Sequence, residues 1–531
     1  MKITFIQRQI FALPGIASLT ASVKHAGHEA DILIENAEAK FEDVLAASGP
    51  DVVGVTICSS DVNWLIETLP RIRQSVPDAF LLVGGIHPTI HPALLDEYPE
   101  IDAICVGEGE EVVVELLGAL QGASSGNQLS VNGEQSGGKG KQSEKDGKRL
   151  AVSGEQSGKD GKQLAVSSEQ SPLTDYRLPL TVHPPPLTSI RNLHIRWQDR
   201  IYRNEMRPLI TNLDDYPEDR TIYFKRYPDL ARDTLLQYIF SRGCPYPCSF
   251  CVNSSLNRIF KGLGPVQRRK SVDFSLREIK KLRRFYVNAA TGFFIDDLFL
   301  HDKKWVKEFL PRYKEEIGLP YICSAGPNTI DEEMADLLKE TGCASVEFGI
   351  ETGNEEKRKQ IYHKWAFTDA EFRRQIGLVK LRGIEVYCPS MFVFPTETPA
   401  DSFRTVEFYH ELGVDHPFSS FLIPYPDTEI FNIAVKYKAI PPDLRAEDLP
   451  SNYFTQSACR IPKLRVIENI QYLFYFFVRF PRFYRYFRWL VYIPIPLKVI
   501  RYAGLFFWFK NWKRMRYSET IRYFWRFRKA Q

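Results

Sequence analysis

The sequence predicts an α/β protein: a doubly wound parallel sheet, then a partial barrel of six strand–helix units, then a helical region. Three observations predict this order. Short apolar runs alternate with helical patterns in residues 1–121, and the alternation returns with longer units in residues 234–431. Residues 432–531 are rich in aromatic side chains interleaved with arginines. A chain of 531 residues is too long for one core, so several domains are expected.

Five apolar runs define the predicted sheet of the first domain. They are rich in Val, Ile and Leu, and helical stretches separate them, which is typical of β-α repeats in a five-stranded parallel sheet. The runs cover residues 2–6, 30–34, 51–57, 79–85 and 102–107. Ligands of such sheets bind over the carboxyl ends of the strands. Those ends are expected at Cys58–Ser60, Gly84–Thr89 and Gly107–Gly109.

Residues 122–172 have a different composition, dominated by Gly, Ser, Lys, Gln and Glu, and they contain partial repeats of LAVSGEQSGKDGKQ. A segment without aromatic residues cannot bury enough apolar surface to fold, so we interpret it as a low-complexity linker. Residues 173–233 are then expected to connect the two domains.

Six further apolar runs predict the partial (β/α)₆ barrel, and each is followed by a helical or loop segment. They cover residues 235–241, 288–296, 321–327, 345–351, 385–394 and 418–424. Barrel chemistry gathers at the C-terminal ends of the strands.

The loop after the first barrel strand contains SRGCPYPCSFC, which places Cys244, Cys248 and Cys251 in a Cys-x₃-Cys-x₂-Cys pattern. Three thiolates can ligate three irons of a [4Fe–4S] cluster and leave the fourth iron open. Structural zinc would need a fourth Cys or His ligand, and none lies nearby. The alternative is that the three cysteines are only buried packing residues.

Together these features resemble the cobalamin-binding branch of the radical S-adenosylmethionine (SAM) superfamily, over roughly residues 1–121 and 190–431. The cysteine loop carries the resemblance with the aromatic Phe250 before its last cysteine. Other similar segments are GGIHPT (84–89), VGEGE (106–110), RPLITNLDDYPEDR (207–220), FFIDDLF (293–299), VEFGIETGN (346–354), FVFPTET (392–398) and IPYPDTEIF (423–431).

The resemblance implies that SAM is bound near Phe250 and near acidic residues at the ends of barrel strands. Glu351 ends the fourth strand, although it could also be a surface carboxylate. Asp296 and Asp297 end the second, where they could instead be loop acids or a helix cap. Glu397 lies in a segment that departs from the family's Gly-x-Pro-Gly-Glu-Thr, because Val393 and Thr396 replace both glycines.

The resemblance also implies a cobalamin site in the first domain, although its glycines could equally serve ordinary tight turns. No Asp-x-His-x-x-Gly motif follows the first strand, so a lower histidine ligand for cobalt is not expected. We expect His87 to shape the pocket rather than to ligate the metal. The expected cobalamin-binding residues are Ser59, Gly84, Gly85, His87, Pro88, Gly107, Glu108 and Gly109.

The implied cofactors are a [4Fe–4S] cluster, SAM and cobalamin, with flavodoxin or ferredoxin as electron donor. The implied activity is C-methylation of an unactivated carbon on a small hydrophobic, lipid or isoprenoid-like substrate. A cobalamin-dependent oxidative or ring-forming reaction is the alternative within the family. From another class, a membrane-associated iron–sulfur electron carrier or redox sensor is the competing hypothesis. The individual catalytic residues are not predicted.

Residues 460–531 hold seventeen Lys or Arg residues against two Glu, while the rest of the chain is acidic. Arginines interrupt the aromatic runs every few positions, as in helices that lie on an anionic membrane surface. A nucleic-acid patch, which we do not expect, and a helix packed on the enzyme's own core are the alternatives. The expected location is the cytoplasm, with peripheral contact to the inner face of the membrane.

Overall fold

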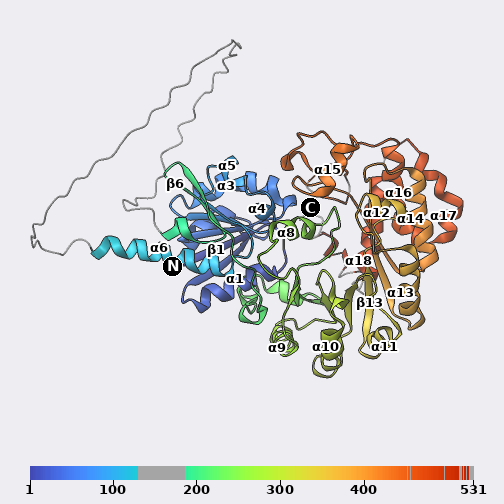
Figure 1. Ribbon diagram of the computed structural model, residues 1–531, viewed down its shortest axis with the longest axis horizontal. Helices are drawn as coiled ribbons and strands as arrows, with labels where there is room; N and C mark the ends of the chain where they lie inside the picture. The colour runs from blue at the N-terminus through green and yellow to red at the C-terminus, as the bar shows by residue number, and fades with distance from the viewer. Residues whose placement is uncertain are drawn as a thin grey trace, which may run out of the picture.

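The computed structural model describes residues 1–129 and 186–512, except residues 451, 455, 495 and 496. Beyond residue 512 it describes residues 517, 520, 521 and 523–525. The N-terminal sheet lies beside a larger barrel, and the C-terminal helices cover one side of that barrel (Figure 1). Most of the predicted linker 122–172 lies outside the described residues, and helix α6 (Glu110–Leu129) continues into its start.

The first five strands are parallel, in the order β2-β1-β3-β4-β5, as the apolar runs predict. This order reverses between β1 and β3, which places the ligand crevice of a doubly wound fold at their carboxyl ends. The strands are β1 (Lys2–Gln7), β2 (Glu29–Ile34), β3 (Val52–Thr56), β4 (Phe80–Gly84) and β5 (Ala103–Cys105).

Helices cover both faces of this sheet, and each face has its own apolar core. α1 (Pro14–His25) and α6 pack on one face, while α2 (Phe41–Ser48) and α3 (Val62–Ser75) pack on the other. Short helices over the strand ends are η1 (Glu35–Ala37), η2 (Ser59–Asp61), α4 (Ile86–Ile90) and α5 (Leu94–Glu97).

The sheet has seven strands rather than five, because a hairpin from the predicted connector extends it. β6 (Leu193–Trp197) pairs antiparallel with β5, and β7 (Arg200–Arg203) pairs antiparallel with β6. Gln198 and Asp199 form the two-residue turn with positive φ angles of 46° and 60°. Such turns usually carry Gly or Asn, so this sequence gave no turn signal.

The rest of the connector joins the two domains through short elements. Buried Tyr223, on α7, packs into the core of the first domain and donates a hydrogen bond to Gln7. The elements are η3 (Pro186–Ser189), η4 (Leu213–Asp215), α7 (Thr221–Arg226) and η5 (Pro228–Arg232).

The second domain is the predicted partial barrel of six parallel strands, and it stays open between its first and last strands. The strands are β8 (Leu235–Tyr238), β11 (Thr291–Phe294), β12 (Tyr321–Ala325), β13 (Cys343–Phe348), β14 (Glu385–Phe392) and β15 (His416–Phe421). A two-stranded ribbon of β9 (Ser241–Arg242) and β10 (Arg268–Arg269) follows β8.

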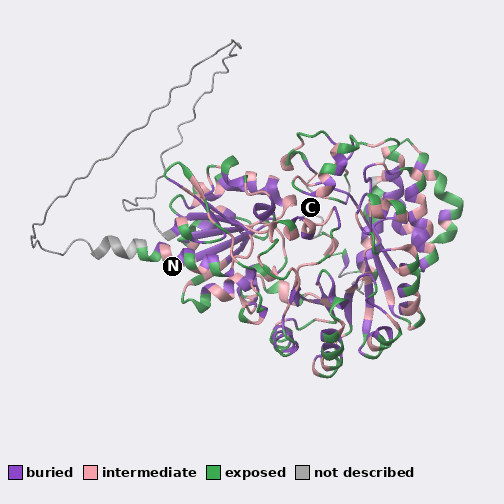
Figure 2. Cartoon of the chain, in the orientation of Figure 1, coloured by how far each residue is buried: buried purple, intermediate pink, exposed green. Residues whose placement is uncertain are grey.

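Helices surround the barrel and bury the outward-facing side chains of its strands, so the purple core in Figure 2 lies between strands and helices. The longer helices are α9 (Val272–Arg283), α10 (Lys303–Glu316), α11 (Glu332–Glu340), α13 (Asp369–Leu381) and α14 (Pro399–Leu412). The shorter ones are α8 (Val252–Ile259), η6 (Phe299–His301), α12 (Glu355–Gln360), α15 (Glu429–Lys436) and η7 (Ala446–Asp448).

The C-terminal region is helical, as predicted, but its first helix is not interfacial. α16 (Leu464–Arg479) packs against α14 and β15, and its aromatic side chains belong to the barrel core. α18 (Lys498–Trp512) packs on α16 and β15. Packing on the enzyme's own core is therefore the alternative that describes these two helices, and their expected membrane-surface role is not shown.

Between them, α17 (Pro481–Phe487) and η8 (Arg488–Tyr492) lie on the outside of the barrel. Among the described residues, no helix is both long and apolar enough to cross a bilayer.

Candidate active site

The three cysteines lie between β9 and α8, at the carboxyl end of the first barrel strand. Gly243 leads into this loop with a φ of +86°, and a Cβ there would lie 2.1 Å from the carbonyl oxygen of Val266. Only glycine avoids both the strain and the clash, so it fixes the point where the cysteine loop leaves the β9–β10 ribbon.

The three thiols lie close enough to affect one another. Burial, together with the charges of neighbouring thiols such as Cys251, raises the pKa of Cys244 to about 12 and that of Cys248 to about 11. Yet no three His, Cys, Asp or Glu side chains in the described part of the chain are placed to hold a single metal ion. A cubane takes one thiolate on each of three irons and therefore spreads its ligands, so the loop fits a cluster better than zinc.

Glu351 lies beside this loop, paired with a lysine. Lys364 Nζ lies 3.0 Å from Glu351 Oε1 and also donates to the carbonyl oxygen of Gly349. The Lys364 ammonium opposes the rise in the pKa of Cys248 and Cys251 that burial causes, which places it close to the cysteines. No sequence motif pointed to Lys364.

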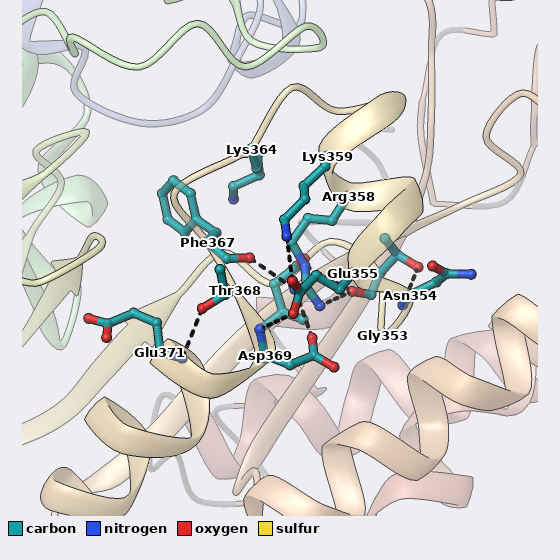
Figure 3. Close-up of polar contacts among 12 residues, drawn as sticks. Gly353, Asn354, Glu355, Arg358, Lys359, Lys364, Phe367, Thr368, Asp369 and Glu371 are labelled. Atoms are coloured by element: carbon teal, nitrogen blue, oxygen red, sulfur yellow. Dashed lines mark hydrogen bonds and ion pairs between the residues drawn. The ribbon is translucent and has the colours of Figure 1, made fainter.

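A fully buried arginine holds the segment that carries this pair (Figure 3). The Arg358 guanidinium donates to the carbonyl oxygens of Ile350, Thr352 and Phe367, and it lies 2.9 Å from Asp369 Oδ1. Since these acceptors lie on both sides of the Glu351–Lys364 pair, Arg358 positions it without belonging to it.

The other predicted SAM residues have identifiable neighbours. Phe250 packs edge-on against Tyr362 at 5.3 Å between ring centroids. Asp296 is buried and accepts hydrogen bonds from the Phe240 amide, at 3.1 Å, and from the Ser241 hydroxyl, so it fixes the end of β8. Asp297 remains exposed, and its charge raises the pKa of Cys244 and Cys251, so of the two aspartates it is the one that faces the cysteine loop.

Glu397 is buried within its own turn. Its carboxylate accepts hydrogen bonds from the amides of Val393 and Phe394 and from the Ser402 hydroxyl at 2.6 Å. Burial raises the pKa of Glu397 to about 8. Val393 and Thr396, which replace the family's glycines, still adopt positive φ angles of 63° and 72°. The turn therefore keeps a glycine-like backbone, which Glu397 stabilises from inside.

A cavity of about 460 Å³ lies between the two domains. On one side it is lined by the predicted residues Gly84, Gly85, Gly107, Glu108 and Gly109, and on the other by residues 239–243 and part of α8. Gly85 has a φ of +106°, and a Cβ there would lie 2.5 Å from the carbonyl oxygen of Ile57. Glycine is thus required where this turn packs against Ile57, and the same turn lines the cavity.

His87 and Ser59 lie away from that cavity. His87 is buried, its Nδ1 lies 3.1 Å from the Ser59 hydroxyl, and burial lowers its pKa to about 4. Its ring stacks on His91, which bridges Asp427 and Glu97. His87 lines a second cavity of about 550 Å³ instead, and Pro88, although buried, lines neither.

Comparison with known families agrees with both halves of this arrangement. Residues 10–117 match the B12 binding domain, and residues 238–409 match the radical SAM superfamily. The first match covers the domain whose glycines line the cavity, and the second covers the barrel that carries the cysteine loop. The chain is a cobalamin-binding radical SAM enzyme. Its cofactors are a [4Fe–4S] cluster, SAM and cobalamin.

Relatives of this radical SAM enzyme cover most of the chain at modest identity. An uncharacterized methyltransferase of Pyrococcus horikoshii is 27% identical over 83% of this chain and 85% of its own length. The anaerobic magnesium-protoporphyrin IX monomethyl ester cyclase of Rubrivivax gelatinosus is 23% identical over 79% of this chain, which spans 65% of the cyclase.

Among solved structures, the radical SAM methyltransferase TsrM from Kitasatospora setae, with cobalamin and a [4Fe–4S] cluster bound, shares the fold. The TM-score is 0.59 at 19% identity, and the alignment covers 82% of this chain and 78% of TsrM.

In this radical SAM enzyme an ionic clasp joins the two domains next to the cavity. Glu108 Oε1 lies 2.7 Å from Arg242 and 2.8 Å from Arg268, and Glu108 Oε2 accepts the Ile210 amide at 2.7 Å. Glu110 pairs with the same Arg242 at 2.5 Å. The carboxylate of Glu108 thus ties the domains together. Sequence reasoning missed both arginines, although Arg242 immediately precedes the Gly-Cys of the cluster motif.

Proposed function

We propose that the enzyme transfers a methyl group to a carbon of an apolar substrate held in the barrel. One observation carries the proposal: the cavity and the cysteine loop share a wall. Residues 239–243, which lead into the loop, and Asn253 and Asn257, which follow it on α8, all line the cavity. Cobalamin and SAM bound there would supply a methyl group and one-electron chemistry to the same space.

The protein's own residues would then position these groups. Cys244, Cys248 and Cys251 would hold the cluster, while Glu351, held by Lys364, and Asp297 would bind SAM beside it. The glycines Gly85 and Gly107 would let cobalamin approach the sheet. An external one-electron donor such as flavodoxin or ferredoxin would reduce the cluster.

The test is a labelled-methyl experiment on the reconstituted enzyme. SAM carrying a trideuterated methyl group is added, with reductant, to a metabolite extract from cells lacking this protein. We expect a product heavier by the labelled methyl, and none with Cys248→Ala enzyme. Release of 5′-deoxyadenosine without labelled product would refute methyl transfer.

An oxidative or ring-forming reaction is the second candidate, because the similarity to the cyclase of Rubrivivax gelatinosus extends over 79% of the chain. It predicts an unlabelled product whose mass changes by loss of hydrogen or gain of oxygen. The electron-carrier hypothesis is set aside by membership in a SAM-cleaving enzyme superfamily.

We further propose that the enzyme is cytoplasmic and that α17 and η8, rather than the whole tail, contact the anionic inner face of the membrane. The surface patch they form, with the end of α16, exposes Phe480, Tyr486, Phe487, Trp489 and Tyr492 between the exposed arginines Arg479, Arg482, Arg485 and Arg488. Aromatic rings with flanking arginines suit the boundary of an acidic bilayer. Tyr484 fixes the patch to α14 through a 3.0 Å hydrogen bond to Glu407.

Flotation with vesicles containing phosphatidylglycerol tests this patch. We expect Trp489→Ala to reduce binding to these vesicles. Trp365→Ala is the matched control, because Trp365 is equally exposed on another surface. Equal flotation of the wild type and both variants would contradict the proposal.

A further inference from the structure

The barrel interior keeps accessible surface toward the carboxyl ends of its strands, and we call this region the chamber. Outward-facing strand residues are buried under the helices, and inward-facing Ile322, Ser345 and Tyr387, nearer the amino ends, are buried as well. Inward-facing residues toward the carboxyl ends of the strands keep accessible surface instead. A packed interior would bury both sets equally. The partly accessible, inward-facing residues are Gln237, Ile239, Phe293, Ile295, Ser324, Glu347, Pro389, Met391, Phe418 and Ser420.

One carboxylate faces this space without a partner. Glu347 is the next-to-last residue of β13, in register with Ser324 on β12 and with Tyr387 on β14. It forms no hydrogen bond or ion pair with any described residue. The nearest cation, Lys364, is already committed to Glu351. Burial, and then the charge of Glu351, raise the pKa of Glu347 to about 7.

A partly buried carboxylate without a partner gains from a bound donor, because the hydrogen bond offsets the water contacts that the carboxylate has lost. A bound molecule carrying an N–H group would provide one. An ammonium group would interact more strongly still, since both partners are then charged.

Aromatic side chains from the C-terminal helix lie beside this carboxylate. The indoles of Trp508 and Trp512 stack at 4.8 Å, and the ring of Tyr387 lies 5.8 Å from the first and 5.7 Å from the second. Trp512 also meets Phe293, and Trp508 meets Phe418, so α18 forms an aromatic wall of the chamber.

In the described part of the chain, both indole N–H groups are buried and have no hydrogen-bond partner. Trp508 is only 5% exposed. Buried polar groups are normally paired, and an unpaired one calls for an explanation. An acceptor on a bound molecule, such as a carbonyl oxygen, would satisfy them.

We propose that the chamber binds a planar, ring-containing molecule through an N–H or ammonium group on Glu347, with its ring beside the Trp508–Trp512 wall. The inference deepens the proposed function, because the molecule held there would be the substrate. The proposed substrate is thereby narrowed from any apolar compound to a ring compound that carries nitrogen.

Calorimetry on the reconstituted holoenzyme tests the site without turnover. S-adenosylhomocysteine occupies the SAM site, and the probes are 2-(aminomethyl)naphthalene and 2-naphthoate, which share a ring but differ in charge. We expect the ammonium probe to bind at least about ten-fold more tightly than the carboxylate, consistent with a charge-assisted hydrogen bond.

Glu347→Gln should abolish this preference while keeping full cobalamin and iron content, because the amide has the same shape and removes only the charge. Glu340→Gln, at an exposed position on α11, should retain the preference, and Trp512→Leu should weaken both probes. A preference that survives in Glu347→Gln, or no binding of either probe, would overturn the proposal. Probe binding without labelled methyl transfer would instead refute only the proposed reaction.

Discussion

The ionic clasp between the domains gives the most quantitative prediction. Glu108→Ala removes the carboxylate that pairs with Arg242 and Arg268 and accepts the Ile210 amide. Arg242 keeps Glu110, whereas Arg268, whose side chain is only 6% exposed, keeps just the Ile210 carbonyl oxygen. Removing one partner of a buried ion pair costs about 3–5 kcal/mol, and we expect a loss of about 3 kcal/mol because one arginine stays paired.

Urea unfolding followed by tryptophan fluorescence measures this loss, and cobalamin retention reports whether the cavity opens. The matched control is Glu111→Ala, which removes an ion pair to Arg207 from a side chain that is 45% exposed. That pair should contribute less than about 1 kcal/mol. Equal urea midpoints for the two variants would refute the idea that the clasp joins the domains.

Three further outcomes follow from the site. Because the pKa of Glu397 is about 8 in the folded protein and 4.5 otherwise, the fold holds a proton that the unfolded chain loses, so stability falls as pH rises between these values. From pH 6 to 9 the Tm of Glu397→Gln, whose side chain cannot ionise, should fall less than the Tm of the wild type. An equal fall in Tm for the two proteins would disprove this. Arg358→Met should destabilise the protein by about 3 kcal/mol and weaken SAM binding, while exposed Arg373→Met should do neither. Cys248→Ala should lose the iron–sulfur absorbance but keep the wild-type circular dichroism spectrum; unchanged absorbance would remove that cysteine from the cluster.

The fold could be predicted because its signal is local. Period-two and helical patterns placed all eleven predicted strands, with boundaries that differ from the structure by a few residues. The β6–β7 hairpin could not be predicted, because Gln198–Asp199 is an unusual pair for a tight turn.

The C-terminal region shows the limit of composition as evidence. Aromatic residues interleaved with arginines suit a membrane surface and a protein core equally, and only tertiary packing separates α16 from α17. Arg501 illustrates the point: its guanidinium is buried against Ser419 on β15 rather than exposed to lipid.

The residues of the candidate site also differ in whether the sequence could reveal them. The cysteines could be found because their spacing lies within one loop. Lys364 and Arg358 could not be found, because they act across long loops whose contacts appear only in the folded chain. The glycines of the cavity were predictable from their motif, whereas the pairing of Glu108 with the barrel was not.

The central claim is that cobalamin and the cluster occupy neighbouring sites in one chain. Electron paramagnetic resonance of bound cobalamin, in its paramagnetic cobalt(II) state, measures this directly. We predict faster spin relaxation of the cobalt signal when the cluster is reduced, and slow relaxation in Cys248→Ala enzyme that still binds cobalamin. Identical relaxation in the two proteins would contradict the shared wall on which the proposed chemistry depends.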